Sequence, residues 1–112
     1  VTAGLAARFE NVVALGLLRK IHEGQDLRGE KSGLYYLRDK EKREVDFLTV
    51  IDRNIQDLVE VKQSDDKLSS NLAYFSQRLM PERPAQVVLS LQREQTVSGI
   101  PIVAAANWLS GL

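Results

Sequence analysis

Two strand-like segments joined by a short turn constrain the fold of this chain most strongly. Residues 43–51 and residues 55–62 both alternate apolar and polar side chains, the period of a β-strand with two different faces. Residues 52–54, Asp-Arg-Asn, separate the two segments, and such residue types favour a tight turn. The pattern therefore predicts an antiparallel hairpin with a three-residue loop.

Matching of apolar side chains predicts the register of this hairpin. On one side, apolar residues then face one another in the pairs Ile51–Ile55, Phe47–Val59 and Val45–Val61. The other side has the pairs Leu48–Leu58, Asp46–Glu60 and Glu44–Lys62. A shift by one residue would set Phe47 and Val45 opposite polar residues and mix the two faces.

In this register Asp46 and Glu60 are direct neighbours. Directly opposed residues lie roughly 5 Å apart at Cβ, a distance at which two negative charges destabilise a sheet. A divalent cation between them would remove the repulsion, and oxygen ligands without cysteine favour Mg²⁺ or Mn²⁺ over zinc. Lys62 lies two residues beyond Glu60 and so points to the same face. Its ammonium group could hold an attacking water or stabilise charge on a phosphate.

A third carboxylate is predicted on the first helix. Residues 3–23 carry apolar side chains at spacings of three and four, which indicates an amphipathic helix, and Gly24 is its expected end. Glu10 lies on the flank of the apolar stripe, near Val13 and Leu17. A helix that covers this face of the sheet would bring Glu10 toward Asp46.

The remaining segments predict an α/β domain. We expect a short strand at 34–38, a helix at 66–80, a buried strand at 85–91, a loop at 96–99, a strand at 100–104 and a helical turn at 105–109. The order α-β-β-β-α-β, with a less regular end, indicates a mixed sheet flanked by helices. A length of 112 residues suits a single domain covering residues 1–112.

Charge and composition limit the functions that this domain can have. The formal net charge is zero, whereas nucleic-acid binders usually carry a basic excess. Contact with phosphates would therefore need a local patch, a metal or a partner. No apolar run is long enough to cross a membrane, and no signal peptide is present, so we expect a cytoplasmic location. The chain opens on Val1 within a helical pattern, so we expect a fragment of a larger protein.

The hairpin resembles the signature of the PD-(D/E)XK nuclease superfamily. The resemblance rests on residues 43–48, Arg-Glu-Val-Asp-Phe-Leu, and residues 58–62, Leu-Val-Glu-Val-Lys, although the Pro-Asp pair of that signature is missing. It implies a restriction-endonuclease-like core, catalytic residues Asp46, Glu60 and Lys62, and metal ligands Glu10, Asp46 and Glu60. Gln77 on the following helix is a candidate auxiliary residue, and so is Glu44 beside the pair.

Nearly the whole chain is also similar to a C-terminal domain of unknown function. That domain follows an AAA-type ATPase domain and a winged-helix segment in many bacterial and archaeal proteins. The matching segments are Phe9-Glu10-Asn11, Leu34-Tyr35-Tyr36-Leu37-Arg38, Arg43-Glu44-Val45-Asp46-Phe47 and Val59-Glu60-Val61-Lys62-Gln63-Ser64. This similarity implies an N-terminal ATPase domain of the same longer chain as a partner.

Three functions fit these observations. The first is a magnesium-dependent nuclease that hydrolyses DNA phosphodiesters. The second is a non-catalytic module that binds DNA or another domain of a larger ATPase, which the zero net charge favours. The third is an ordinary structural role, in which Glu44 and Lys62 form an ion pair while Asp46 and Glu60 are solvated.

Other conspicuous residues have simpler interpretations. We expect His22 on the surface near a helix end, and the charged run at 38–43 in a solvated turn. The aromatic residues are expected in the core or at its boundary rather than in a base-stacking platform; they are Tyr35, Tyr36, Tyr74 and Trp108.

Overall fold

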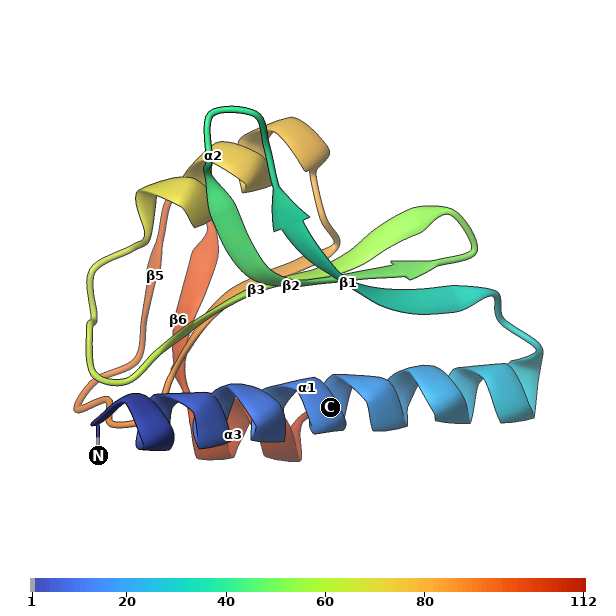
Figure 1. Ribbon diagram of the computed structural model, residues 1–112, viewed down its shortest axis with the longest axis horizontal. Coiled ribbons are helices and arrows are strands. Elements are labelled where there is room, and N and C mark those ends of the chain that lie inside the picture. Colours follow the sequence, from blue (N-terminus) through green and yellow to red (C-terminus); the bar gives the residue numbers. More distant parts are fainter. Residues whose placement is uncertain (1) are drawn as a thin grey trace.

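The computed structural model contains one mixed six-stranded sheet with helices on both faces (Figure 1). It describes the backbone of residues 2–112 and the side chains of residues 7–112. The elements are α1 (Thr2–Arg28), β1 (Ser32–Arg38), β2 (Glu44–Ile51), β3 (Asn54–Lys62), α2 (Ser70–Leu79), β4 (Arg83–Val88), β5 (Gln95–Val97), β6 (Ile100–Ala104) and α3 (Ala105–Ser110). The predicted α/β class and the flanked mixed sheet are thereby confirmed.

The sheet combines an antiparallel meander with parallel strands, in the order β1-β2-β3-β4-β6-β5. β1, β2 and β3 pair antiparallel, while β4 pairs parallel with β3 and β6 pairs parallel with β4. The helix α2 returns the chain from β3 to β4, as a parallel connection requires. The segment at 96–99, predicted as a loop, contributes the edge strand β5 and a two-residue turn at Ser98 and Gly99, both with positive φ.

Two apolar clusters hold the layers together. On one face, α1 and α3 cover the sheet around Phe9, Val13, Leu17, Val59, Ala85, Val87 and Ala105. On the other face (Figure 1), Leu72 and Phe75 of α2 pack with Val45, Leu58 and Ile100 of the sheet. Of the predicted stripe of α1, Phe9, Val13, Leu17 and Ile21 are buried, whereas Val12 is 48% exposed and Leu5 lies outside the described side chains. Each fully buried aliphatic side chain contributes about 1.5–3 kcal/mol.

The first helix runs to Arg28, beyond its predicted end at Gly24. The helix ends at Gly29, which has φ +65° and donates its N–H to the carbonyl of Gln25 at 3.1 Å. That is the left-handed termination that glycine favours. Gly24 is buried within the helix, and the carboxylate of Glu30 lies against it where the chain turns back.

The predicted hairpin register is confirmed in its middle and wrong at both ends. Phe47 pairs with Val59 and Leu48 pairs with Leu58, as expected. The loop has two residues instead of three, because Asp52 and Arg53 both adopt positive φ, and a register shift lies between Leu48 and Val50. Two-residue turns with positive φ match the twist of a hairpin.

A second irregularity turns Val45 to the opposite face. Tyr35 pairs with Leu48 and Leu37 with Val45, so two steps along β1 correspond to three steps along β2. This is a β-bulge on β2, and a bulge bends the strand and re-aims its side chains. Val45 consequently packs with the α2 cluster, whereas Val61 packs with the α1 cluster. The predicted shared face of Val45 and Val61 is therefore wrong.

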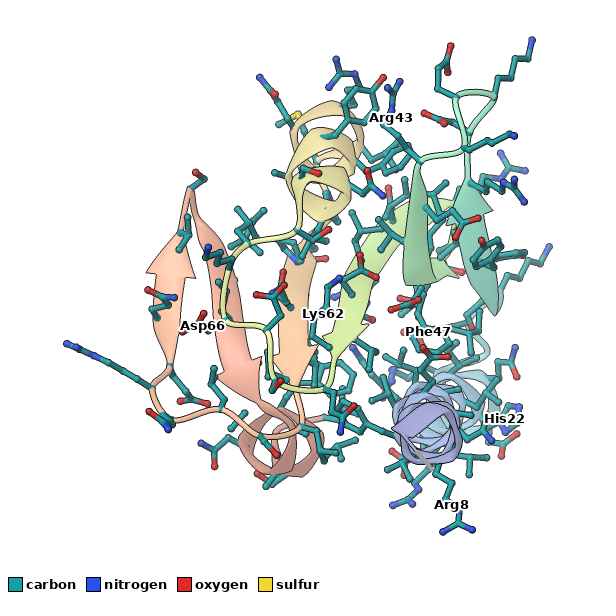
Figure 2. All side chains as sticks on the ribbon, turned by 60° about the vertical axis from the view of Figure 1, so that its left-hand side comes forward. Arg8, His22, Arg43, Phe47, Lys62 and Asp66 are labelled. Carbon is teal, nitrogen blue, oxygen red and sulfur yellow. The ribbon has the colours of Figure 1, made fainter. Side chains whose placement is uncertain are left out.

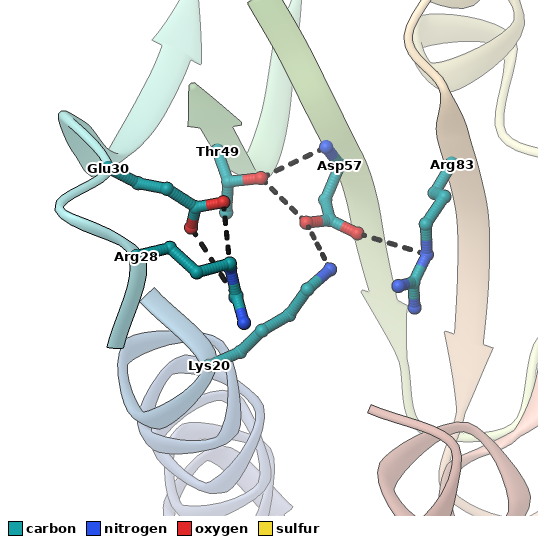
Figure 3. A network of polar contacts seen from close by, with 6 residues as sticks. All are labelled: Lys20, Arg28, Glu30, Thr49, Asp57 and Arg83. Carbon is teal, nitrogen blue, oxygen red and sulfur yellow. Dashed lines mark hydrogen bonds and ion pairs between the residues drawn. The ribbon is translucent and has the colours of Figure 1, made fainter. Parts of the chain in front are cut away.

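A buried ionic network fastens α1 to the sheet (Figure 3). The carboxylate of Asp57 on β3 is 1% exposed and lies 3.3 Å from the ammonium of Lys20 on α1 and 3.5 Å from Arg83 on β4. The hydroxyl of Thr49 on β2 donates to the same carboxylate at 2.6 Å. The network thereby links α1, β2, β3 and β4.

Candidate functional site

The bulge on β2 places Asp46 against β3. Its carboxylate accepts the backbone N–H of Val61 at 2.8 Å, a bond that replaces a regular strand-to-strand contact. The side chain is thereby fixed beside Glu60, the residue before Val61. Asp46 and Glu60, which the predicted hairpin register paired, are therefore adjacent in the structure. The bulge keeps them adjacent although the strands are out of regular register at this point.

Glu60 is buried beside a second acid. Its side chain points to the α2 face of β3, and the residue is 8% exposed. Burial, the hydrogen bond with the Asp46 carboxyl and the charge of Asp46 raise the pKa of Glu60 to about 8. The hydroxyl of Ser69 and the charge of Lys62 act in the opposite direction. At neutral pH the two carboxyl groups therefore share a proton, which is what two like charges in close contact require in the absence of a cation.

The start of α2 provides a support for Glu60 that the sequence had not indicated. The hydroxyl of Ser69 donates to Glu60 Oε2 at 3.1 Å and accepts the N–H of Leu72 at 3.2 Å, so it caps the helix while it holds the acid. The helix had been predicted to begin at residue 66, which placed Ser69 inside it. A serine three residues before the apolar stripe resumes at Leu72 is the signal that could have identified the cap.

Gln86 holds this cap in place from β4. Its side chain is fully buried, and its carbonyl oxygen accepts the N–H of Ser69 at 2.8 Å. Its amide nitrogen donates to the backbone carbonyls of Asp65 and Lys67 at 3.3 and 2.7 Å. A lone glutamine in the apolar run of β4 needs such partners, because an unpaired buried amide is costly. Gln86 thereby fixes the loop that carries Ser69.

Lys62 and Glu44 do not form the ion pair that the predicted register suggested. Lys62 lies half-buried at the end of β3 (Figure 2). It lies two residues beyond Glu60 on the same strand, so both side chains point to the same face. Glu44 instead lies 3.4 Å from Arg38 on β1. The bulge separates Glu44 from Lys62, because it interrupts the regular pairing of β2 before that position.

Glu10 approaches Asp46 from α1. The two side chains line one groove between α1 and the β1–β2 edge of the sheet, together with Leu34, Tyr35, Tyr36 and Phe47. Partial burial and the charge of Asp46 raise the pKa of Glu10. The helix thus packs with Glu10 toward the pair. Among the side chains at 7–112, however, no three acids or histidines converge closely enough to hold a metal ion by themselves.

The other residues singled out from the sequence lie elsewhere. Gln77 is exposed on α2 and lines a separate hollow with Pro81, Pro84 and Ile100. His22 is exposed on a side of α1 turned away from the sheet (Figure 2). In the charged run at 38–43, Arg43 forms an ion pair with Asp39 at 2.9 Å. Its guanidinium carbon lies 3.8 Å from the centre of the Tyr74 ring.

The donors at the Asp46–Glu60 pair are of the kind that a hard divalent cation prefers, and the protein supplies two of them. Carboxylate oxygens are the ligands that Mg²⁺ and Mn²⁺ prefer, and a cation would replace the shared proton. Magnesium keeps several waters and is often completed by phosphates of its substrate, so two protein carboxylates can suffice. The pair is therefore a candidate half-site, with Glu10 within electrostatic range.

Comparison with known proteins identifies the chain at the level of its family. No curated protein and no solved structure matched it. Within residues 2–112, no helix has the length and apolar character needed to span a bilayer. The model of DUF4143, described as a domain of unknown function, matches residues 6–108. Because that match covers almost the entire sequence, the chain belongs to the DUF4143 family.

Proposed function

We propose that this domain is a metal-dependent nuclease module of the PD-(D/E)XK type that acts on DNA phosphodiesters. The observation that carries the proposal is the contact between Asp46 and the buried Glu60, which raises the pKa of Glu60 to about 8. Strongly shifted acids in contact are typical of functional sites. The order α1-β1-β2-β3-α2-β4, with β4 parallel to β3, supports the restriction-endonuclease-like core that the sequence resemblance implies.

Each residue has a separate task in this proposal. Asp46 and Glu60 hold Mg²⁺ or Mn²⁺, and Glu10 assists from α1. A divalent cation bound there would supply an activated water and neutralise charge on the phosphate. Lys62, on the same face as Glu60, positions the nucleophile or the phosphate. The hydroxyl of Ser69 donates to Glu60 Oε2 at 3.1 Å and so fixes the orientation of this carboxyl group.

The proposed setting follows from the same similarity. An ATPase domain in the same longer chain would deliver or move the DNA, which a domain with zero net charge does not attract strongly by itself. We place this assembly in the cytoplasm.

A non-catalytic module that binds DNA or another domain is the second candidate. Both carboxyl groups already have partners in the protein, because Asp46 accepts the N–H of Val61 and Glu60 accepts the hydroxyl of Ser69. A protonated pair of this kind is a stable structural element without a metal. The absence of a third converging ligand among the described side chains also favours this reading.

Titration of Mg²⁺ and Mn²⁺ against thermal unfolding separates the candidates. A cation at ten times its Kd raises the unfolding free energy by about 1.4 kcal/mol, roughly 5 °C for a domain of this size. We expect this rise in the parent protein and in Glu82→Gln, which removes an exposed acid far from the pair, and no rise in Asp46→Asn. A parent melting temperature that does not respond to millimolar metal would rule out the metal site.

Cleavage of single-stranded and duplex DNA then tests catalysis directly. The parent should cut in Mg²⁺ or Mn²⁺ and not in EDTA. Lys62→Met should keep the metal-dependent rise in melting temperature while it loses cleavage. Metal binding without any cleavage by the parent would favour the non-catalytic module.

A further inference from the structure

Large apolar or aromatic side chains are exposed on two neighbouring elements. On β1, Tyr35 and Tyr36 are 55% and 57% exposed, so their expected place in the core or at its boundary is wrong. On α1, Val12 is 48% exposed and Leu15 is 63% exposed. The charged residues that line the groove at the tyrosines are acids, whereas those that line the groove at Val12 and Leu15 have both signs. A surface with both signs of charge can complement a second copy of itself.

A projection and a hollow lie next to each other on this outer face of α1. Leu15 projects into solvent, and the adjacent Gly16 lines a groove of about 380 Å³ with Leu109 and Leu112. A Cβ at Gly16 would lie 3.1 Å from each of these two leucines, so glycine leaves space that any other residue would fill. A two-fold interface pairs one patch with the same patch of a second copy, and a projection beside a hollow meets this condition.

The residues of this face are symmetric about a point between Leu15 and Gly16. They occupy positions 8, 12, 15, 16, 19 and 23, and their spacing is the same in both directions along the helix. Spacings of three and four place them on one side of α1. Two copies of α1 in antiparallel contact about that point would set Leu15 of each copy against Gly16 of the other. Arg8 of each copy would then lie opposite Glu23 of the other.

The charges favour this alignment over others. Arg8 and Glu23 are exposed, and none of the ion pairs among the described side chains includes either residue. Arg8 points away from the sheet (Figure 2). A shift by four residues would set Arg8 opposite Arg19 of the second copy, where like charges repel. The symmetric alignment instead pairs unlike charges and lays the aliphatic stem of Arg19 over Val12.

We propose that two copies of this chain form a dimer through the outer face of α1, with the two helices antiparallel and the two-fold axis between Leu15 and Gly16. The proposal is independent of the proposed function, because Glu10 lies on the opposite side of α1, toward Asp46. A contact of one helix from each copy is small for a specific interface, so we expect a dissociation constant in the micromolar range.

Sedimentation equilibrium of the 112-residue chain in EDTA, from micromolar to millimolar concentration, tests the proposal. The parent should change from monomer to dimer across this range. Leu15→Glu brings two carboxylates together at the two-fold axis and should weaken the dimer by about ten-fold or more. Because Leu15 is exposed, the dilute variant should unfold at the same temperature as the dilute parent.

Exchange of charges tests the alignment. Arg8→Glu sets two carboxylates against each other at both ends of the contact and should weaken the dimer about ten-fold. Lys40→Glu makes the same change of charge in the exposed turn between β1 and β2, and this control should dimerise like the parent. Addition of Glu23→Arg to Arg8→Glu restores the unlike pairs and should return the dissociation constant to within about three-fold of the parent. Positions 8 and 23 lie about 22 Å apart along one helix, so this rescue requires a contact between two copies.

Three results would overturn the proposal. The first is a parent that stays monomeric up to millimolar concentration. The second is a dimer that Leu15→Glu leaves unchanged, which would use another face. The third is an exchange of charges without rescue, which would exclude the antiparallel alignment. The expected pattern in EDTA supports the dimer whether or not the domain cleaves DNA.

Discussion

Two carboxylates lie buried on β3, three residues apart, and the charges around them differ. Asp57 is 1% exposed and faces α1, where Lys20 and Arg83 lie 3.3 and 3.5 Å from its oxygens (Figure 3). Glu60 is 8% exposed and faces α2, where another acid, Asp46, lies beside it. None of the described lysines and arginines forms an ion pair with Glu60.

The difference separates a structural acid from a candidate functional one. A buried carboxylate is costly unless a cation or hydrogen bonds compensate its charge. The charge of Asp57 is compensated by the cations of Lys20 on α1 and Arg83 on β4, and these ion pairs connect both elements to β3. Glu60 is compensated by a proton, which a metal ion can replace. Burial alone therefore does not indicate a site, whereas burial beside a like charge without a fixed cation does.

Removal of the charge of Asp57 should have the largest effect on stability. Asp57→Asn keeps the size of the side chain but leaves Lys20 and Arg83 without their partner. Breaking a buried ion pair costs about 3–5 kcal/mol, and we expect the lower end because both cations reach solvent. Denaturant unfolding of parent and variant measures the loss.

The double variant Asp57→Asn with Lys20→Met is the control for this prediction. It removes one of the two cations left unpaired, so part of the lost stability should return. A cost for Asp57→Asn below about 1 kcal/mol, the range of exposed pairs, would show that the network does not act as a buried one.

Glu60 should make the protein less stable as pH rises. Its pKa of about 8 in the folded state lies above the ordinary value of 4.5, so between these values the folded state binds more protons than the unfolded state. Stability from this group is fully present below pH 4.5 and is lost as pH rises through 8. The loss is at most about 1.4 kcal/mol per pH unit.

Glu60→Gln tests this dependence because an amide imitates the protonated acid. The variant should gain stability relative to the parent as pH is raised from 5 to 8, and the gain should level off above that. Saturating Mg²⁺ should flatten the same dependence in the parent, because a cation replaces the proton. A constant difference between parent and variant over this range would contradict the shared proton.

The sequence predicted the parts of the site that depend on regular periodicity. Alternation in β2 and β3 was enough to pair Phe47 with Val59 and Leu48 with Leu58, and so to bring Asp46 near Glu60. The spacing of Phe9, Val13 and Leu17 correctly predicted the buried stripe of α1. These patterns are local, and burial of one face determines them.

The sequence did not show the features that depend on irregular backbone or distant partners. The bulge at residues 46–47 inserts an extra residue without a glycine or proline to mark it, so Val45 was assigned to the wrong face. Ser69 and Gln86 act through hydrogen bonds between β3, β4 and the loop before α2. The cations of Asp57 come from residues 37 positions earlier and 26 positions later in the chain, a pairing that no local pattern contains.

Ser69→Ala should cost about 1 kcal/mol, the usual contribution of a helix N-cap. It should also raise the pKa of Glu60 further, because the Ser69 hydroxyl donates to the Glu60 carboxylate and favours its charged form. The pH at which the stability difference between parent and Glu60→Gln levels off would then move upward in the Ser69→Ala background. Ser69→Thr keeps the hydroxyl and is the control. A simple loss of stability that is the same at every pH would mean that Ser69 caps the helix without acting on Glu60.

Loss of the ion pair between Arg38 and Glu44 should have the smallest effect on stability. This pair is the solvent-exposed counterpart of the buried Lys20–Asp57 pair. Its atoms lie 3.4 Å apart, close to the Lys20–Asp57 distance of 3.3 Å, but the two side chains are 51% and 46% exposed. If distance decided the strength of an ion pair, the two pairs would be equivalent. Solvent screening predicts instead a coupling of about 0.5 kcal/mol or less for Arg38 and Glu44.

A double-mutant cycle with Arg38→Ala and Glu44→Ala, repeated at low and high salt, measures this coupling. A value near that of the buried Asp57 network, insensitive to salt, would show that the edge strand is shielded from solvent.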